Sequence, residues 1–206
     1  TKPTGDVPAL LSFDEAQTLF HEFGHALHGL LSQCTYNKVS GTSVPRDFVE
    51  LPSQIMENWA ADPEVLKVYA RHYKTGEPIP QELIDKLKNS GHFNQGFVTT
   101  EFMAAALLDM AYHTRNTTDP VNPNEFEKAT LEKIGLIPEI TVRYRSPYFQ
   151  HIFAGGYSSG YYAYTWAEVL DADAFEAFKE TGNIFNPEKA KAFRENILCK
   201  GGSEDA

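Results

Sequence analysis

Apolar residues recur at helical spacing along most of this chain, and polar residues occupy the positions between them. The clearest example lies between residues 12 and 31, where the apolar stripe consists of Leu19, Phe20, Phe23, Ala26, Leu27, Leu30 and Leu31. Ser12, followed by Glu15 three positions later, fits a capping box, which marks the start of a helix. The pattern therefore predicts a buried amphipathic helix in this segment.

Proline and glycine mark the boundaries of further helices. An N-cap residue precedes a proline at the first helical position in Asp62-Pro63, Asn122-Pro123 and Asn186-Pro187. Glycines stand where these helices would stop, so helices are expected over residues 63–74, 80–90, 96–115, 123–134, 158–181 and 187–199. Strand signals are sparse, and Tyr36–Val44 is the best candidate for a short extended piece. We expect residues 1–206 to form one mainly α, multi-helical lobe with few or very short strands.

The sequence His21-Glu22-Phe23-Gly24-His25 in the first predicted helix carries the candidate chemistry. The two histidines stand four positions apart, so one helical turn brings both imidazoles within reach of a single metal ion. The Glu22 carboxylate is close enough to accept a proton from a water at that ion. Gly24 costs the helix roughly 1 kcal/mol relative to alanine, which indicates that backbone or substrate approaches closely there.

A catalytic zinc usually takes three protein ligands and leaves a fourth position for water, so a third ligand is needed. His28 lies on the same helical stripe, but its offset from His21 corresponds to roughly 10 Å along the axis, which is too far for a shared ion. We expect His28 to pack in the core or to support a ligand. Glu50 is the stronger candidate, because it lies in the segment from Arg46 to Trp59, which is predicted to be a second helix with Pro52 near its first turn. A carboxylate from a second, antiparallel helix would complete the ligand set.

Two other carboxylates leave the choice of third ligand open. Asp47 or Glu57 could take the place of Glu50. Glu57 could instead accept a hydrogen bond from a ligating imidazole, or it could be an ordinary surface carboxylate.

A third segment, residues 146–167, contains 22 residues without Asp, Glu, Lys or Arg. Its length suggests a membrane span, but three glycines and five tyrosines argue against one. Gly155 and Gly156 indicate a turn into a helix that begins near Ser158. The tyrosines that follow at offsets of four and three are Tyr157, Tyr161 and Tyr164. Their hydroxyls can donate to a carbonyl oxygen that gains negative charge, although tyrosines at helical spacing more often serve packing.

Three motifs, taken in order, resemble a known family. HEFGHALHG, SGTSVPRDFVELPSQ and HIFAGGYSSGYYAYTW look like the zinc metallopeptidases of the thimet oligopeptidase and neurolysin family, and closest to its bacterial peptidyl-dipeptidase (dipeptidyl carboxypeptidase) branch. The similarity covers essentially the whole chain. It implies a zincin-type catalytic lobe with one Zn²⁺ per chain and an enzyme that hydrolyses short peptides.

The resemblance also implies roles for individual residues. The metal ligands would be His21, His25 and Glu50, with Glu22 as the general base. Tyr157 and Tyr164 would donate hydrogen bonds to the transition state, and His151 and Tyr161 would be neighbours that bind substrate. Members of the family are several hundred residues longer, so we expect this chain to be a catalytic segment. The missing N-terminal region of its parent would form the other wall of a deep channel.

The branch resemblance implies release of C-terminal dipeptides, which requires a group that binds a free carboxylate. Arg46, Arg143 and Arg145 are possible anchors, because a guanidinium suits bidentate carboxylate binding. An endo-oligopeptidase of the same family is the alternative activity. A segment that binds zinc or peptide without catalysis is a second alternative. A purely structural zinc is disfavoured, because the four-ligand, often cysteine-rich set is missing.

The composition of the chain limits the binding partners and the cellular compartment that we expect for the protein. A net charge of −10 with no large basic cluster makes a nucleic-acid surface improbable, and no membrane partner is expected. Cys34 and Cys199 have no metal-ligand spacing and suggest no disulfide framework. A reducing compartment is the simpler account of these two cysteines, so we expect a cytoplasmic protein.

Overall fold

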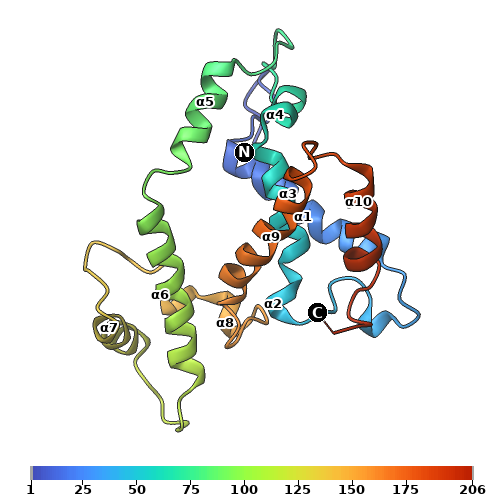
Figure 1. Cartoon of the computed structure of the whole chain (residues 1–206). Coiled ribbons are helices and arrows are strands. Elements are labelled where there is room, and N and C mark those ends of the chain that lie inside the picture. Colours follow the sequence, from blue (N-terminus) through green and yellow to red (C-terminus); the bar gives the residue numbers. More distant parts are fainter. Residues whose placement is uncertain (1, 206) are drawn as a thin grey trace. The chain divides into compact units, whose positions relative to one another are not determined.

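The computed structural model describes residues 2–205, and the regular structure in that range is helical (Figure 1). The helices are α1 (Phe13–Leu31), α2 (Arg46–Val49), α3 (Leu51–Ala61), α4 (Pro63–Tyr69), α5 (Gln81–Ser90), α6 (Gln95–His113), α7 (Pro123–Lys133), α8 (Gln150–Phe153), α9 (Ala163–Lys179) and α10 (Pro187–Phe193). Two 3₁₀ turns, η1 (Asn37–Val39) and η2 (Ser146–Tyr148), and a π-helical segment, η3 (Arg194–Leu198), complete the set. Within residues 2–205 the only β-type pairings are two isolated bridges, Thr4 with Val7 and Arg71 with Pro78. The mainly α fold class is therefore confirmed.

The described residues divide into two compact units. The first unit contains the residues up to Gly91 together with those from Ala167 onwards, and the second contains His92–Trp166. Helix α9 begins in the second unit and ends in the first. The expectation of one lobe over residues 1–206 stays a prediction.

Helices α1 and α3 lie side by side in the first unit and run antiparallel (Figure 1). Gln17, near the start of α1, contacts Glu57 in the second half of α3, whereas His25, further along α1, contacts Glu50 just before α3. The close approach occurs at Gly24, where an added Cβ would lie 2.2 Å from the carbonyl oxygen of Pro52. The expectation that Gly24 provides clearance is confirmed, and the group that approaches it is backbone.

The start of α1 matches its sequence signals, but its burial does not. Ser12 Oγ accepts a hydrogen bond from the Glu15 amide at 3.1 Å, and the Ser12 amide donates to Glu15 Oε2 at 2.8 Å, so the capping box is confirmed. The exposed fractions of Leu19, Phe23 and Leu30 are 59%, 53% and 76%. The prediction of a buried helix is therefore wrong for that part of the stripe. The other side of the stripe, with Phe20, Leu27 and Leu31, lines an apolar cavity together with Pro52, Met56 and Trp59 of α3.

The second unit has a core of its own around α6. Ala105 and Ala106 of α6 pack with Phe149, Ile152 and Tyr161. A second cluster joins Ala104 and Leu108 of α6 to Val142, with partly buried side chains of α7 at its edge. None of the helices formed by residues 2–205 has both the length and the apolar character that a bilayer crossing requires.

Three of the expected elements differ from those in the structure in ways that the local backbone explains. Tyr36–Val44 is not a strand, because it contains the 3₁₀ turn η1 and turns that follow it. Helix α4 ends at Tyr69 and not near residue 74, since the chain turns back into the Arg71–Pro78 bridge. Helix α9 begins at Ala163 and not near residue 158, because Ser159 adopts a left-handed φ of 56°, which interrupts a right-handed helix.

Candidate functional site

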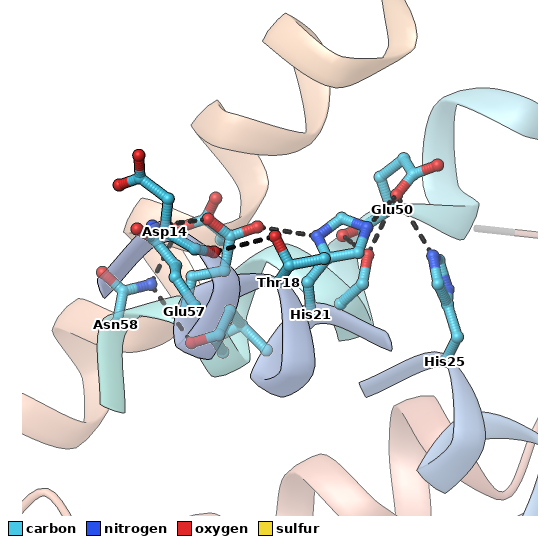
Figure 2. A network of polar contacts seen from close by, with 11 residues as sticks. Asp14, Thr18, His21, His25, Glu50, Glu57 and Asn58 are labelled. Atoms are coloured by element: carbon cyan, nitrogen blue, oxygen red, sulfur yellow. Dashed lines mark hydrogen bonds and ion pairs between the residues drawn. The ribbon is translucent and has the colours of Figure 1, made fainter. Parts of the chain in front are cut away.

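Three side chains of the first unit converge in a geometry that suits a metal ion. His21 and His25 come from α1, and Glu50 lies at the junction between α2 and α3. Oε2 of Glu50 is 3.3 Å from Nε2 of His21 and 3.3 Å from Nε2 of His25 (Figure 2). One possible ligand atom from each of the three residues lies within 4.8 Å of the other two. Two imidazole nitrogens and one carboxylate oxygen form a donor set typical of catalytic zinc.

Glu50 is held in place by its own local structure. Its backbone is in the right-handed helical region, at the point where α2 gives way to α3, and the residue is 2% exposed. Ser53 Oγ lies 3.0 Å from Glu50 Oε2 and 2.9 Å from the Glu50 carbonyl oxygen. A buried carboxylate is costly unless it is paired with a cation or with donors, so this position favours a positively charged partner.

The second ring nitrogen of His21 is bound by a carboxylate. Its Nδ1 lies 2.6 Å from Glu57 Oε1 (Figure 2). Gln17 Nε2 donates to Glu57 Oε2 at 2.7 Å. Burial lowers the pKa of His21, but the hydrogen bonds and negative charges of Glu50 and Glu57 outweigh it and raise this pKa to about 9. In the neutral imidazole, Glu57 keeps the remaining proton on Nδ1, so the lone pair of Nε2 is on the side of Glu50, as a metal ligand requires.

The other histidines of α1 have different surroundings. Nδ1 of His25 has no hydrogen-bond partner among residues 2–205. His28 is fully buried, and neither of its ring nitrogens has a partner in the same range. Burial lowers the pKa of His28, and the nearby charge of His25 lowers it further. His28 is also outside the three-residue group, which agrees with the packing role expected for it.

The remaining carboxylates near the motif take separate positions. Asp47 is half-buried in α2 and is not one of the three residues that converge. Glu57 is not one of them either, because its carboxylate contacts Nδ1 of His21, the ring nitrogen that faces away from Glu50. Glu22 is exposed on α1 beside His21. Within the described part of the chain, no hydrogen bond or ion pair engages the Glu22 carboxylate. It is therefore available to exchange a proton with a small molecule.

The residues of the third motif form an aromatic cluster in the second unit. The rings of Tyr157 and Tyr164 stack with centroids 5.2 Å apart and an interplanar angle of 16°. Tyr161 lies 5.2 Å from Tyr164, and the His151 ring is between 5.6 and 6.2 Å from all three tyrosine rings. Tyr161 is buried, and burial raises its pKa, so its hydroxyl stays protonated near neutral pH. The four residues singled out from the sequence therefore lie together.

Residues 1–206 match the sequence profile described as Peptidase family M3. The chain belongs to that family. It is 48% identical over 206 residues to dipeptidyl carboxypeptidase of Escherichia coli (strain K12), a match that covers 99% of this chain and 30% of the relative. It is 44% identical over 206 residues to oligopeptidase A of the same organism, again over 99% of this chain and 30% of the relative. Mitochondrial intermediate peptidase of Botryotinia fuckeliana is 38% identical over 204 residues, 96% of this chain and 26% of the relative. The chain thus spans about a third of the length of these curated relatives.

The three candidate arginines of this M3 chain have different contacts. Arg145 pairs through Nε with the buried carboxylate of Glu127. The Arg143 guanidinium lies 4.3 Å from the Phe102 ring centroid and 5.8 Å from that of Tyr144. No carboxylate among residues 2–205 forms an ion pair with Arg143. Arg46 is exposed in α2.

Two residues that lie at the aromatic cluster of His151, Tyr157, Tyr161 and Tyr164 were not identified from the sequence of this M3 chain. Tyr144 lies 4.7 Å from the His151 ring and 5.3 Å from the Phe149 ring. Asp109 of α6 accepts a hydrogen bond from the amide of Ser159, two residues after Tyr157. A single acid within the apolar run Ala104–Met110 was the signal that could have identified Asp109.

Proposed function

We propose that this chain carries the zinc centre and the hydrolytic residues of an enzyme that cleaves short peptides. The observation that supports this proposal most is the position of Glu50 Oε2, 3.3 Å from Nε2 of both His21 and His25. The carboxylate is buried, and the two nitrogens point at it, so the cluster gains stability when a divalent cation lies between them. Membership of peptidase family M3 agrees with this chemistry.

Each residue has a part in the proposed reaction. His21, His25 and Glu50 hold one Zn²⁺, which when bound polarises the substrate carbonyl and makes water more acidic. The exposed Glu22 carboxylate takes a proton from the attacking water and delivers it to the leaving amine. The hydroxyls of Tyr157 and Tyr164 donate hydrogen bonds to the carbonyl oxygen as it becomes negative. His151 and Tyr161 are the substrate-binding neighbours, and Tyr161, which is buried, also packs within the aromatic cluster.

Measurement of metal content together with peptide cleavage tests this proposal. The purified chain and its longer parent are dialysed with zinc, and their metal content and their cleavage of an internally quenched peptide are measured. We expect one zinc per chain and cleavage that a chelator abolishes and zinc restores. Binding of zinc without cleavage in either form would support the alternative, a segment that binds zinc or peptide without catalysis. Wild-type levels of zinc in a Glu50→Ala variant would refute the assigned centre.

We further propose that the enzyme removes dipeptides from the C-terminus of its substrates. Identity to a dipeptidyl carboxypeptidase supports this specificity, and the nearly equal identity to oligopeptidase A keeps internal cleavage as the alternative. Arg143 is a better candidate for the carboxylate anchor than Arg145, because Arg145 already pairs with Glu127. Mass spectrometry of the products from one peptide with a free or an amidated C-terminus separates the two specificities. Equal cleavage of both peptides would favour the endo-oligopeptidase.

We propose that the parent protein is longer and that its N-terminal region covers part of α1 and forms the other wall of the substrate channel. Two observations support this: the chain spans 30% of two M3 relatives, and Leu19, Phe23 and Leu30 are largely exposed. We place this protein in the cytoplasm, because Cys34 and Cys199 are both free thiols.

A further inference from the structure

Asp109 is a buried acid that the proposed reaction does not use directly. It lies in the middle of α6 and is 0% exposed. Its Oδ1 accepts a hydrogen bond from the Ser159 amide at 3.0 Å, and its Oδ2 accepts one from the Tyr161 amide at 2.9 Å. Nδ1 of His113, one helical turn further along α6, lies 2.8 Å from Oδ1. Both carboxylate oxygens are therefore engaged, as burial of an acid requires.

The backbone that Asp109 binds is the segment that carries the tyrosines. Residues 154–162, here called the tyrosine loop, join α8 to α9. Gly156 has a φ of 81° and Ser159 a φ of 56°, so the loop is in the left-handed region at two positions. For Ser159, which has a Cβ, this conformation costs free energy and persists only when the surroundings stabilise it. The hydrogen bonds from Ser159 and Tyr161 to one carboxylate provide that stabilisation on both sides of Gly160.

The anchored loop determines where two phenol rings meet. Tyr157 lies in the loop, and Tyr164 lies in the first turn of α9, directly after it. Their rings stack at 5.2 Å. Donors stabilise a developing negative charge only when they are already aimed at it, because reorienting them during the reaction costs free energy. A loop released from Asp109 would keep both hydroxyls but lose their mutual placement.

We propose that Asp109 is a positioning residue for the transition-state donors Tyr157 and Tyr164, and that it acts by holding the tyrosine loop through the amides of Ser159 and Tyr161. The inference rests on the proposed function of the two tyrosines. Asp109 touches neither substrate nor metal in this role. Its effect on catalysis passes entirely through the two hydroxyls.

The test compares Asp109→Asn with wild type in whichever form cleaves the quenched peptide, this chain or its longer parent. An asparagine keeps one acceptor oxygen but turns an NH₂ group towards the second amide. We expect kcat to fall on the order of 10- to 100-fold, with KM and zinc affinity nearly unchanged. Asp173→Asn, an exposed aspartate of α9, is the matched control and should behave as wild type.

A double-mutant cycle separates positioning from general destabilisation. In a Tyr157→Phe/Tyr164→Phe background the hydroxyls are gone, so Asp109→Asn should reduce kcat no further. An equal reduction in both backgrounds would overturn the proposal. If Asp109→Asn fails to fold, Asp109→Glu replaces it in the same cycle, because it keeps the charge and moves it by one methylene. The expected loss of kcat is then smaller, and it should again vanish in the double-phenylalanine background.

Hydrogen–deuterium exchange provides a readout that does not depend on catalysis. The amides of Ser159 and Tyr161 should lose protection in Asp109→Asn, and those of α1 should not. Unchanged protection would overturn the anchoring role even if the wild-type protein is inactive. Loss of protection with full kcat in an active enzyme would reject the link to catalysis while leaving the zinc peptidase proposal intact.

Discussion

Nδ1 of His21 and Oε1 of Glu57 lie 2.6 Å apart, which makes Glu57 the group that orients the first histidine of the HEFGH motif. Glu57 is in turn held by Gln17 of α1, so the contact forms part of a chain of polar groups that ends at Glu50. Carboxylates in this position fix the tautomer of a metal-binding imidazole and increase its basicity.

Loss of the Glu57 carboxylate should weaken zinc binding. We expect Glu57→Gln to reduce zinc affinity on the order of 10- to 100-fold, because the amide no longer offers a charged acceptor to Nδ1 of His21. Competition with a chromophoric chelator measures this affinity. Glu64→Gln, an exposed carboxylate of α4, is the control and should bind zinc as wild type does. Equal affinities for all three proteins would show that Glu57 is an ordinary surface acid.

The proposed general base should be separable from the metal ligands. Glu22→Gln removes the proton acceptor and leaves His21, His25 and Glu50 untouched, so the variant should retain one zinc per chain. Its cleavage of the quenched peptide should fall by about 10²-fold or more. Zinc content by atomic absorption and kcat by fluorescence check the two halves of this prediction. Retained cleavage would reject Glu22 as the base.

The tyrosine hydroxyls should contribute to turnover and not to substrate affinity. Tyr164→Phe keeps the ring that stacks on Tyr157 and removes only the donor, so kcat should fall by about 10²-fold while KM stays close to wild type. Tyr148→Phe removes an exposed hydroxyl of the same segment and serves as the control. A change confined to KM in Tyr164→Phe would indicate a substrate-binding role.

Two glycines of α1 should respond oppositely to the same substitution. In Gly24→Ala the new Cβ would lie 2.2 Å from the Pro52 carbonyl oxygen, so α1 and α3 must separate, at a cost of about 2–3 kcal/mol in unfolding free energy. In Gly29→Ala the new Cβ meets no atom within 4 Å, and the helix should gain roughly 0.5–1 kcal/mol. Thermal unfolding followed by circular dichroism compares the two. Similar melting temperatures for both variants would contradict the close contact at Gly24.

Asp171 should make the fold less stable as the pH rises. Burial raises its pKa, a hydrogen bond from Asn58 lowers it, and the negative charges of Glu57 and Glu168 raise it again, giving a value of about 6 instead of 3.8. The folded state binds this proton more tightly than the unfolded state. The contribution to stability is therefore complete below pH 3.8 and is lost as the pH rises through about 6.

Denaturant titrations at several pH values between 4 and 7, with a chelator present, measure this effect. Wild type should lose on the order of 2 kcal/mol across the window relative to Asp171→Asn, in which the side chain cannot ionise. Asp173→Asn should keep the wild-type pH dependence, since Asp173 is exposed. Parallel curves for wild type and Asp171→Asn would contradict the assignment.

Local sequence signals were sufficient for much of the molecule. The capping box at Ser12, the N-caps at Asp62, Asn122 and Asn186, and the spacing of His21 and His25 all depend on residues within about one helical turn, and the structure agrees with each of them. Gly24 also signalled its close contact, because glycine in a helix interior is unfavourable without a reason.

Tertiary structure decided what depends on residues far apart in the chain. The spacing of the residues favoured Glu50 but left Asp47 and Glu57 open, and in the described part of the chain the packing of α3 on α1 brings Glu50 into the group with His21 and His25. The start of α9 depends on Ser159, whose left-handed backbone is bound by Asp109, 50 positions earlier. Helical periodicity describes which residues share a face of one helix, but it contains no information on which carboxylate from a distant helix will meet that face. For that reason the sequence alone could propose a metal centre, whereas the partners that orient it and the anchor of the tyrosine loop required the packed chain.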